Sequence, residues 1–269
     1  MNSENTIKIG SVLIKFRYQL LQLNSYQLTL LTIWALVMVS IPIVDWSTGW
    51  SAMIGAITIG VSVSAGIVVA LLWGVWGAGT TLRVAVSILV LTWAAEAIGS
   101  NTGLLFGTYS YTDMLQPKIL NVPLQIPLGW LMMLPPSWAV AQAITDRLNP
   151  RWEFPAFVGL SALAMMAWDL FLDPMMVTWE MWVWDNPGSY FGVPWINYLG
   201  WLLVSALITI LIRPGKLPVA PLLIIYTAIW LLKSVGLGAF WGIHGAAIVG
   251  SFFMGGMTIL AWRAIISRN

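Results

Sequence analysis

The chain has 269 residues, of which 59% are hydrophobic and only 8% are charged. This balance predicts a polytopic membrane protein and leaves no room for a sizeable soluble domain. The lack of cysteine excludes disulfides and thiolate chemistry, and the single histidine, His244, excludes a multi-histidine metal site within one chain. The net charge of +2 comes without a basic stripe interleaved with aromatic residues, so nucleic-acid binding is also excluded.

The first 26 residues have two opposite helical faces. Polar residues recur at three- and four-residue spacing from Lys8 to Gln22, with apolar residues between them. This spacing predicts an amphipathic helix on the cytoplasmic membrane surface. Lys15 and Arg17 break the apolar run, which argues against a secretory signal. The predicted organisation is a cytoplasmic amphipathic helix over residues 1–26 and a single transmembrane domain over residues 27–269.

Eight apolar runs follow, and each is expected to be a membrane-spanning helix, because a helix satisfies its backbone hydrogen bonds within the segment. The seventh has the weakest signal, since Lys233 and Gly236 interrupt it. The predicted fold is an all-α, polytopic membrane helical bundle of about eight transmembrane helices. The runs lie near Gln27–Val44, Met53–Trp76, Val84–Ile98, Pro127–Ile144, Phe154–Leu172, Ile196–Ile212, Val219–Leu232 and Trp241–Trp262.

Basic residues predict the orientation of this bundle, because cytoplasmic loops carry an excess of Lys and Arg. With eight spans and both termini in the cytoplasm, ten of the twelve basic residues fall on the cytoplasmic side. Arg83, for example, is expected in a loop between the second and third spans. Only Lys118 and Lys233 fall elsewhere. We therefore expect a multi-pass protein of the cell membrane with both termini cytoplasmic.

Two outer-side connections, Gly99–Leu124 and Asp173–Trp195, are far longer than the roughly two to eight residues usual between bundle helices. In both, a Val-Pro pair is followed after five residues by Gly-Trp, at Gly129-Trp130 and at Gly200-Trp201. We interpret this as a weak parallel repeat, in which the third and fourth spans with their loop correspond to the fifth and sixth with theirs. The alternative is coincidence in a chain with 18 Trp and 24 Gly.

Three acidic residues lie within or at the ends of apolar runs. Glu96 falls in the third run, and Asp169 and Asp173 are four residues apart, so they face the same side of the fifth helix. An ionisable group near the bilayer centre costs roughly 2.5–3.5 kcal/mol on insertion scales, which makes these acids the first candidates for function. Carboxylic acids gathered in an apolar pocket favour the protonated form, which can deliver a proton. The alternative for each is a helix-end acid bonded to loop amides or to Lys118.

Aromatic residues are frequent near these acids. When water is excluded, an aromatic face stabilises a cation by ~0.5–2 kcal/mol, so some of these residues are candidates for the wall of a site. The aromatic belt found at any membrane interface accounts for most of the 18 Trp. The candidates for substrate binding are Trp93, Trp168, Tyr109, Tyr111, Trp182, Tyr190 and Phe191.

Two ordered blocks of motifs cover roughly residues 90–202. The first is Glu96-Ala97-Ile98-Gly99, Thr102-Gly103, Phe106-Gly107-Thr108-Tyr109-Ser110-Tyr111, Val122-Pro123 and Ile126-Pro127. The second is Asp169, Asp173-Pro174-Met175, Trp182, Gly188, Tyr190-Phe191-Gly192-Val193-Pro194, Asn197 and Gly200-Trp201. Together they resemble the CruF-type carotenoid biosynthesis membrane proteins, while the remaining spans match only in hydropathy. Characterised members of that family are carotenoid 1,2-hydratases, which add water to the terminal isopropylidene double bond of a linear or monocyclic carotene.

The resemblance implies hydration without a cofactor or a metal, by protonation of carbon 2 of the end group and addition of water to the cation at carbon 1. Glu96 or Asp169 is then expected to be the acid, with Glu96 preferred, and an ionised Asp173 the base or the stabiliser of the cation. Which acid holds which role stays open. Asn197 joins the aromatic candidates for substrate binding. The implied partners are the carotenoid substrate, membrane lipid and other carotenoid biosynthesis enzymes.

Two other classes of function stay open. A different isoprenoid enzyme, such as an isomerase or cyclase, would use the same acid and aromatic residues. A transporter or lipid-binding protein would couple its outer acids to protons, but the chain lacks charged pairs deep in several helices and has two elaborate outer loops. A prenyltransferase is disfavoured, because Asp169 and Asp173 have no basic neighbours to bind a diphosphate.

Overall fold

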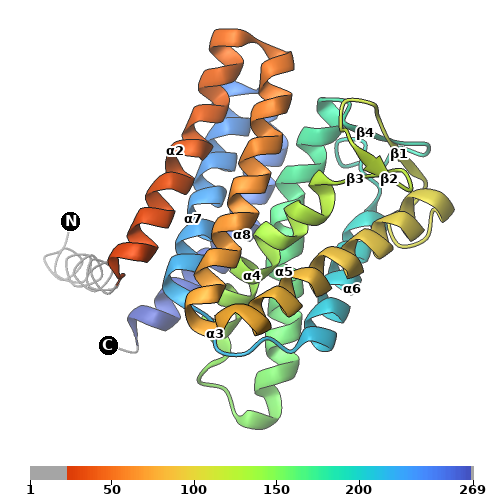
Figure 1. The fold of residues 1–269 in the computed structure, drawn as a ribbon. Coiled ribbons are helices and arrows are strands. Elements are labelled where there is room, and N and C mark those ends of the chain that lie inside the picture. The colour runs from red at the N-terminus through yellow and green to blue at the C-terminus, as the bar shows by residue number, and fades with distance from the viewer. Residues whose placement is uncertain (1–22, 268–269) are drawn as a thin grey trace, which may run out of the picture.

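The computed structural model describes residues 23–267, which form a bundle of helices with two short sheets at one end (Figure 1). The predicted amphipathic helix of residues 1–26 therefore lies almost wholly outside the described residues. The helices are α2 (Ser25–Thr48), α3 (Trp50–Thr102), α4 (Gln125–Thr145), α5 (Pro150–Thr178), α6 (Trp195–Ile212), α7 (Val219–Val235), the π-helical turn η1 (Gly236–Phe240) and α8 (His244–Ile266). The strands are β1 (Tyr109–Tyr111), β2 (Lys118–Ile119), β3 (Val122–Pro123) and β4 (Trp182–Trp184).

The prediction of an all-α polytopic membrane protein is confirmed. Six of the described helices are long and apolar enough to cross a membrane. One of them, α3, has 53 residues and is broken at Gly77, so it supplies two segments, and α4 adds a further helix of 21 residues. Counted in this way, residues 23–267 contain eight helical segments at the predicted positions.

The expected loop around Arg83 is absent. The chain changes direction instead at Gly77, whose φ of 70° lies in the left-handed region that glycine adopts without strain. Helical conformation resumes at once, so Arg83 lies exposed on α3 rather than in a loop. The second half of α3 leaves the first at a wide angle (Figure 1). One left-handed residue thus replaces the connection that the sequence predicts.

The two outer connections are shorter than predicted, because the preceding helices run further. α3 continues to Thr102 and α5 passes through Pro174 to Thr178, which places Asp173 inside a helix rather than at the start of a loop. The seventh run also continues past Lys233, since α7 passes directly into η1. The acids and Lys233 are consequently held by helical backbone.

The two long connections meet at the same end of the bundle. β1 from the first pairs antiparallel with β4 from the second, with Tyr109 opposite Trp184 and Tyr111 opposite Trp182. Alternate residues of a strand point to the same face, so these four aromatic side chains turn together toward the helices. All but the half-buried Tyr111 are buried, whereas the intervening Ser110 and Val183 are exposed.

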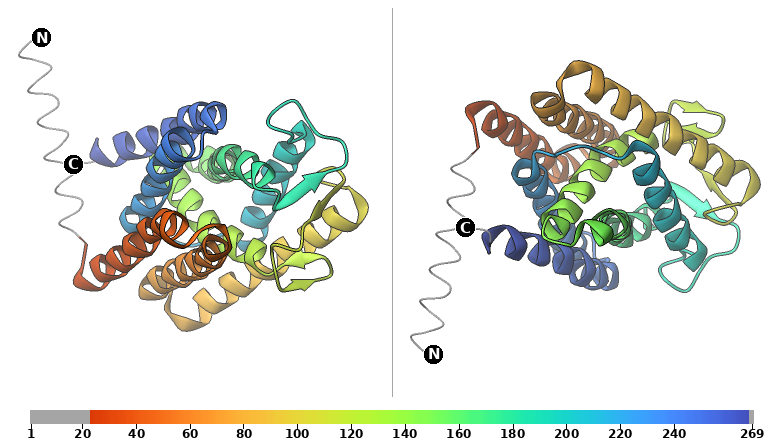
Figure 2. Two further views of the ribbon diagram at one scale, coloured as in Figure 1. Left: turned by 90° about the horizontal axis from the view of Figure 1, so that it is seen from above. Right: turned by 90° about the horizontal axis from the view of Figure 1, so that it is seen from below.

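The centre of the bundle is α4, which packs against α3, α5, α7 and α8 (Figure 2). Its residues from Met133 to Ala141 are fully buried. Because α4 lies between α3 and α5, side chains at the ends of all three helices approach the sheet formed by β1 and β4. The candidate site lies there.

Candidate active site

Glu96 is buried on the second half of α3, where three side chains bond to its carboxyl group. The hydroxyl groups of Tyr109 and Tyr111 donate to Oε2 at 2.6 and 2.7 Å, and Trp130 Nε1 donates to Oε1 at 3.1 Å. Burial raises the pKa of both tyrosines well above the usual value, and the charge of Glu96 raises it further. The two phenols therefore keep their protons and serve as donors. Glu96 is surrounded by hydrogen-bond donors from β1 and α4.

Asp169 and Asp173 form a second acidic group on α5. As their spacing predicts, they face the same way, and Asn197 of α6 joins them. Its Nδ2 donates to Asp169 Oδ2 at 3.1 Å and also to Asp173 Oδ2. One amide thus holds a pair of acids together.

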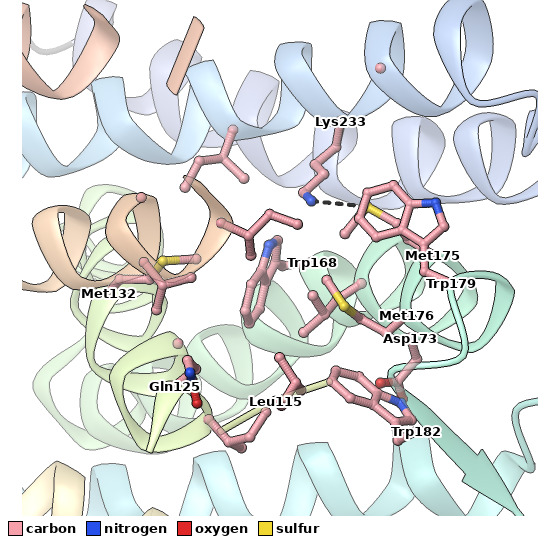
Figure 3. Close-up of a pocket in the computed structure, with 18 of the residues that line it drawn as sticks. Leu115, Gln125, Met132, Trp168, Asp173, Met175, Met176, Trp179, Trp182 and Lys233 are labelled. Atoms are coloured by element: carbon pink, nitrogen blue, oxygen red, sulfur yellow. Dashed lines mark hydrogen bonds between the residues drawn. The ribbon is translucent and has the colours of Figure 1, made fainter. Parts of the chain in front are cut away.

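Glu96 and Asp173 both line one cavity of about 240 Å³ between α2, α3, α4, α5 and α7. Figure 3 shows part of its wall, with Asp173 labelled. Its wall is almost entirely apolar and aromatic, which suits a hydrocarbon ligand. Two acids from different helices therefore line one apolar cavity. The predicted site residues that line it are Glu96, Asp173, Tyr109, Tyr111, Trp168, Trp182 and Asn197.

Four other predicted site residues do not line the cavity. Asp169 lies behind Asp173 and reaches the site only through its carboxyl neighbour and Asn197. Trp93 precedes Glu96 by three residues and turns to the adjoining side of α3, where its Nε1 donates to the carbonyl of Ile119 at 3.2 Å. Phe191 packs over Gly245 at the start of α8, where an added Cβ would lie 2.6 Å from its ring.

Tyr190 also lies outside the cavity, and its role is to complete a helix. Pro174 has no N–H and cannot bond the carbonyl of Leu170 four residues earlier. The hydroxyl of Tyr190 donates to this carbonyl at 3.1 Å. Tyr190 therefore stabilises α5 next to Asp173 from outside the cavity.

The sequence did not mark Trp130 and Trp201 as site residues, although both line the cavity. Their rings stack with centroids 4.1 Å apart and planes 5° apart, and Trp168 meets Trp201 edge-on at 5.8 Å. The available signal was the repeated Gly-Trp pair that suggested a parallel repeat. At Gly200, an added Cβ would lie 2.3 Å from the carbonyl oxygen of Leu105, so glycine allows the first loop to approach α6.

Lys233 is a third cavity residue that the sequence did not mark, and it comes from α7. Its Nζ lies 3.2 Å from the sulfur of Met175 (Figure 3). The available signal was a charge within an apolar run, which is expensive in a membrane and often functional. From sequence alone, Lys233 was an interruption of the seventh run and one of two basic residues off the cytoplasmic side.

The comparisons with known proteins point to one family. Residues 59–257 match the model of a family described as carotenoid biosynthesis proteins. The chain is also similar to bisanhydrobacterioruberin hydratase from Haloarcula japonica, with 30% identity over 132 residues, or 48% of this chain and 44% of that protein. The chain thus aligns with less than half the length of this relative. No solved structure matches it.

Proposed function

The chain belongs to the carotenoid biosynthesis protein family, and on this premise we propose that it is a carotenoid 1,2-hydratase that works without a cofactor. The observation that carries the proposal is the single apolar cavity faced by Glu96 and Asp173. Hydration of an isolated alkene requires a proton donor, stabilisation of a carbocation and restricted access of water. An apolar space with two acids and aromatic walls supplies all three.

We assign the proton donor to Asp173. Two buried carboxyl groups that accept from the same amide repel each other when both are ionised, so we infer that the pair holds a proton. Only Asp173 of this pair lines the cavity. We therefore assign delivery of the proton to Asp173 and its positioning to Asp169.

Glu96 receives the complementary role of a fixed negative charge. Each of its three neighbours donates a hydrogen bond, and charge-assisted bonds of this kind favour the carboxylate. A carboxylate facing the cavity stabilises the positive charge that develops on the substrate. This assignment reverses the preference drawn from sequence alone, in which Glu96 is the acid.

The proposed reaction has two steps. The π electrons of the terminal double bond take the proton of Asp173, which forms a C–H bond at carbon 2 and leaves a tertiary cation at carbon 1. A water oxygen then forms the C–O bond, and its surplus proton returns to the Asp173 carboxylate. The net change is the addition of one water, with the faces of Trp168 and Trp182 available to the cation.

Pigment analysis tests the reaction class. In a carotene-producing host, expression of this chain is expected to yield a carotenoid heavier than its precursor by the mass of one water. The Asp173→Asn chain, expressed to the same level, is the control and is expected to leave the precursor unchanged. A new pigment of unchanged mass would contradict hydration and identify an isomerase or cyclase. No new pigment with any linear or monocyclic carotene would contradict an enzyme of this class.

The tyrosine hydroxyls on Glu96 give a second test. Tyr111→Phe keeps the ring but removes one of three donors to a charged group. Such a bond contributes about 1.5–3 kcal/mol, so we expect kcat to fall about 10- to 100-fold. Tyr190→Phe removes a hydroxyl that bonds only a backbone carbonyl outside the cavity, so it is the matched control and is expected to keep its kcat. Equal losses in the two variants would show that Tyr111 acts through folding alone.

A further inference from the structure

The acids of the site leave one reactant of the proposed hydration, the water molecule, without a binding group. Glu96 already accepts from three donors, and Asp173 shares the amide of Asn197 with Asp169. The rest of the cavity wall is almost entirely apolar, and a water molecule stays in such a space only where a polar group binds it. The reaction therefore needs a further polar group that fixes the water in front of the cation.

Gln125 is a polar residue of the cavity wall that has no role so far. It is the first residue of α4 and is only 8% exposed. Its Nε2 donates to the backbone carbonyl of Gln116 at 2.7 Å and lies 3.5 Å from Thr58 Oγ1. The carbonyl of Gln116 needs a donor, so this contact decides which end of the amide is the nitrogen. The other end, Oε1, is buried and has no hydrogen-bond partner within residues 23–267, although buried polar atoms are nearly always paired.

There is room for a small molecule beside Gln125. Gly129 lies one turn further along the same face of α4 and also lines the cavity. A Cβ added at Gly129 would meet the edge of the Trp168 ring at 3.9 Å, which is an ordinary contact. A water molecule takes roughly 10–15 Å³ of cavity volume, so about 240 Å³ holds one together with the end of a polyene. Gln125 and Trp168, whose ring is available to the cation, are both on the wall that Figure 3 shows.

We propose that the side-chain carbonyl oxygen of Gln125 binds the water molecule that attacks the cation, so that Gln125 commits the cation to hydration. This inference rests on the proposed function of the cavity. An acceptor holds a water molecule through one of its O–H groups, which leaves both lone pairs of the water oxygen available for the new C–O bond. A donor such as Lys233 would instead occupy one of these lone pairs.

The proposed role of Gln125 predicts what happens to a cation that no water captures. Such a cation loses a proton, from carbon 2 or from a methyl group, to the Asp173 carboxylate and becomes an alkene again. In D₂O the acid of Asp173 delivers a deuteron to carbon 2, so one deuteron is gained, one proton is lost, and part of the recovered alkene carries deuterium. The ratio of deuterated alkene to hydrated product therefore measures capture by water, independently of the amount of folded protein.

This ratio is measured by mass spectrometry after the purified full chain in detergent has reacted with a linear carotene in D₂O. Gln125→Met nearly keeps the length of the side chain but removes the acceptor oxygen. We expect the ratio to rise about tenfold, which is the effect of losing one hydrogen bond to a reacting group. Gln142→Met, on the same helix, is the matched control. The Oε1 of Gln142 accepts from the backbone N–H of Leu217 at 3.0 Å, so this variant is expected to keep the native ratio even where its stability falls.

The outcomes separate the role of Gln125 from the reaction itself. A folded Gln125→Met protein with the native ratio would overturn the proposal, however slowly it reacts, and so would an equal rise in Gln142→Met. If Gln125→Met does not fold, Gln125→Asn, which withdraws the amide by one carbon atom, decides by the same ratio. Hydration by the native protein with an unchanged ratio in the variants contradicts Gln125 alone, whereas a native protein that forms no hydrated product contradicts the hydratase and the water site together.

Discussion

Asp173→Asn is expected to abolish hydration while the protein stays folded. Asparagine has the same shape, and its carbonyl can still accept from Asn197 while its amide donates to Asp169, so the buried network survives. What is lost is the acidic proton. General acid catalysis contributes roughly 10²- to 10⁴-fold, and we expect a loss of that order in kcat. The measurement is the initial rate of hydroxylated carotenoid formation by protein whose thermal midpoint matches that of the native chain.

Two companion variants make this result specific. Asp185→Asn removes a carboxylate from the exposed loop after β4 and is expected to leave the rate unchanged. Asp169→Asn is expected to be intermediate, because Asp169 positions the proton but does not face the cavity. A normal rate from Asp173→Asn would remove Asp173 as the acid and return that role to Glu96.

The positions of the helices follow from the sequence, because lipid forces every apolar run to satisfy its own backbone. The break in α3 does not, since it depends on the left-handed conformation of Gly77 among several neighbouring glycines. The continuation of α5 through Pro174 could not be predicted either, because it also depends on a contact between distant residues. The carbonyl that this proline leaves free is bonded by Tyr190, from a loop 20 residues distant along the chain.

The site is predictable only in part, and the missing residues share a cause. Glu96 and Asp173 stand out because a charge in an apolar run is costly wherever it points. Their partners do not stand out, since Trp130 is one of 18 tryptophans and reaches Glu96 only because α4 packs against α3. The cavity position of Lys233 was missed for another reason. Hydropathy registers its charge within the seventh run but does not show which face of α7 it occupies. The burial of a side chain and the direction in which it points depend on tertiary packing, and both are needed to assign roles to the residues of the site.

The distribution of donors explains why two acids in one cavity can act differently. Three donors bond the carboxyl group of Glu96, whereas Asp173 shares one amide donor with a second buried carboxyl group, which favours a proton on that pair. Identical chemical groups thus receive opposite functions from their surroundings, as expected when neighbours rather than residue type set the protonation state. In the proposed reaction the pair supplies the proton and the single carboxylate stabilises the resulting cation.

Glu96→Gln is expected to lower kcat by roughly 10²- to 10³-fold, the range seen when one preorganised electrostatic contact to a transition state is removed. The effect should be smaller than that of Asp173→Asn, because the proton donor remains. The variant also carries a cost in stability, since the new amide has donor hydrogens where Trp130 Nε1 already donates. One buried donor then lacks an acceptor, which costs about 1–3 kcal/mol.

The double variant Glu96→Gln with Trp130→Phe separates the two effects. Removing the indole N–H relieves the conflict between donors, so the thermal midpoint is expected to recover toward that of Trp130→Phe alone, while the rate stays low. Recovery of the rate together with stability would show that Glu96 acts by packing rather than by charge. A loss in Glu96→Gln that exceeds the loss in Asp173→Asn, in folded protein, would make Glu96 the acid and Asp173 the supporting carboxylate, because only the group that supplies the proton is indispensable to the first step.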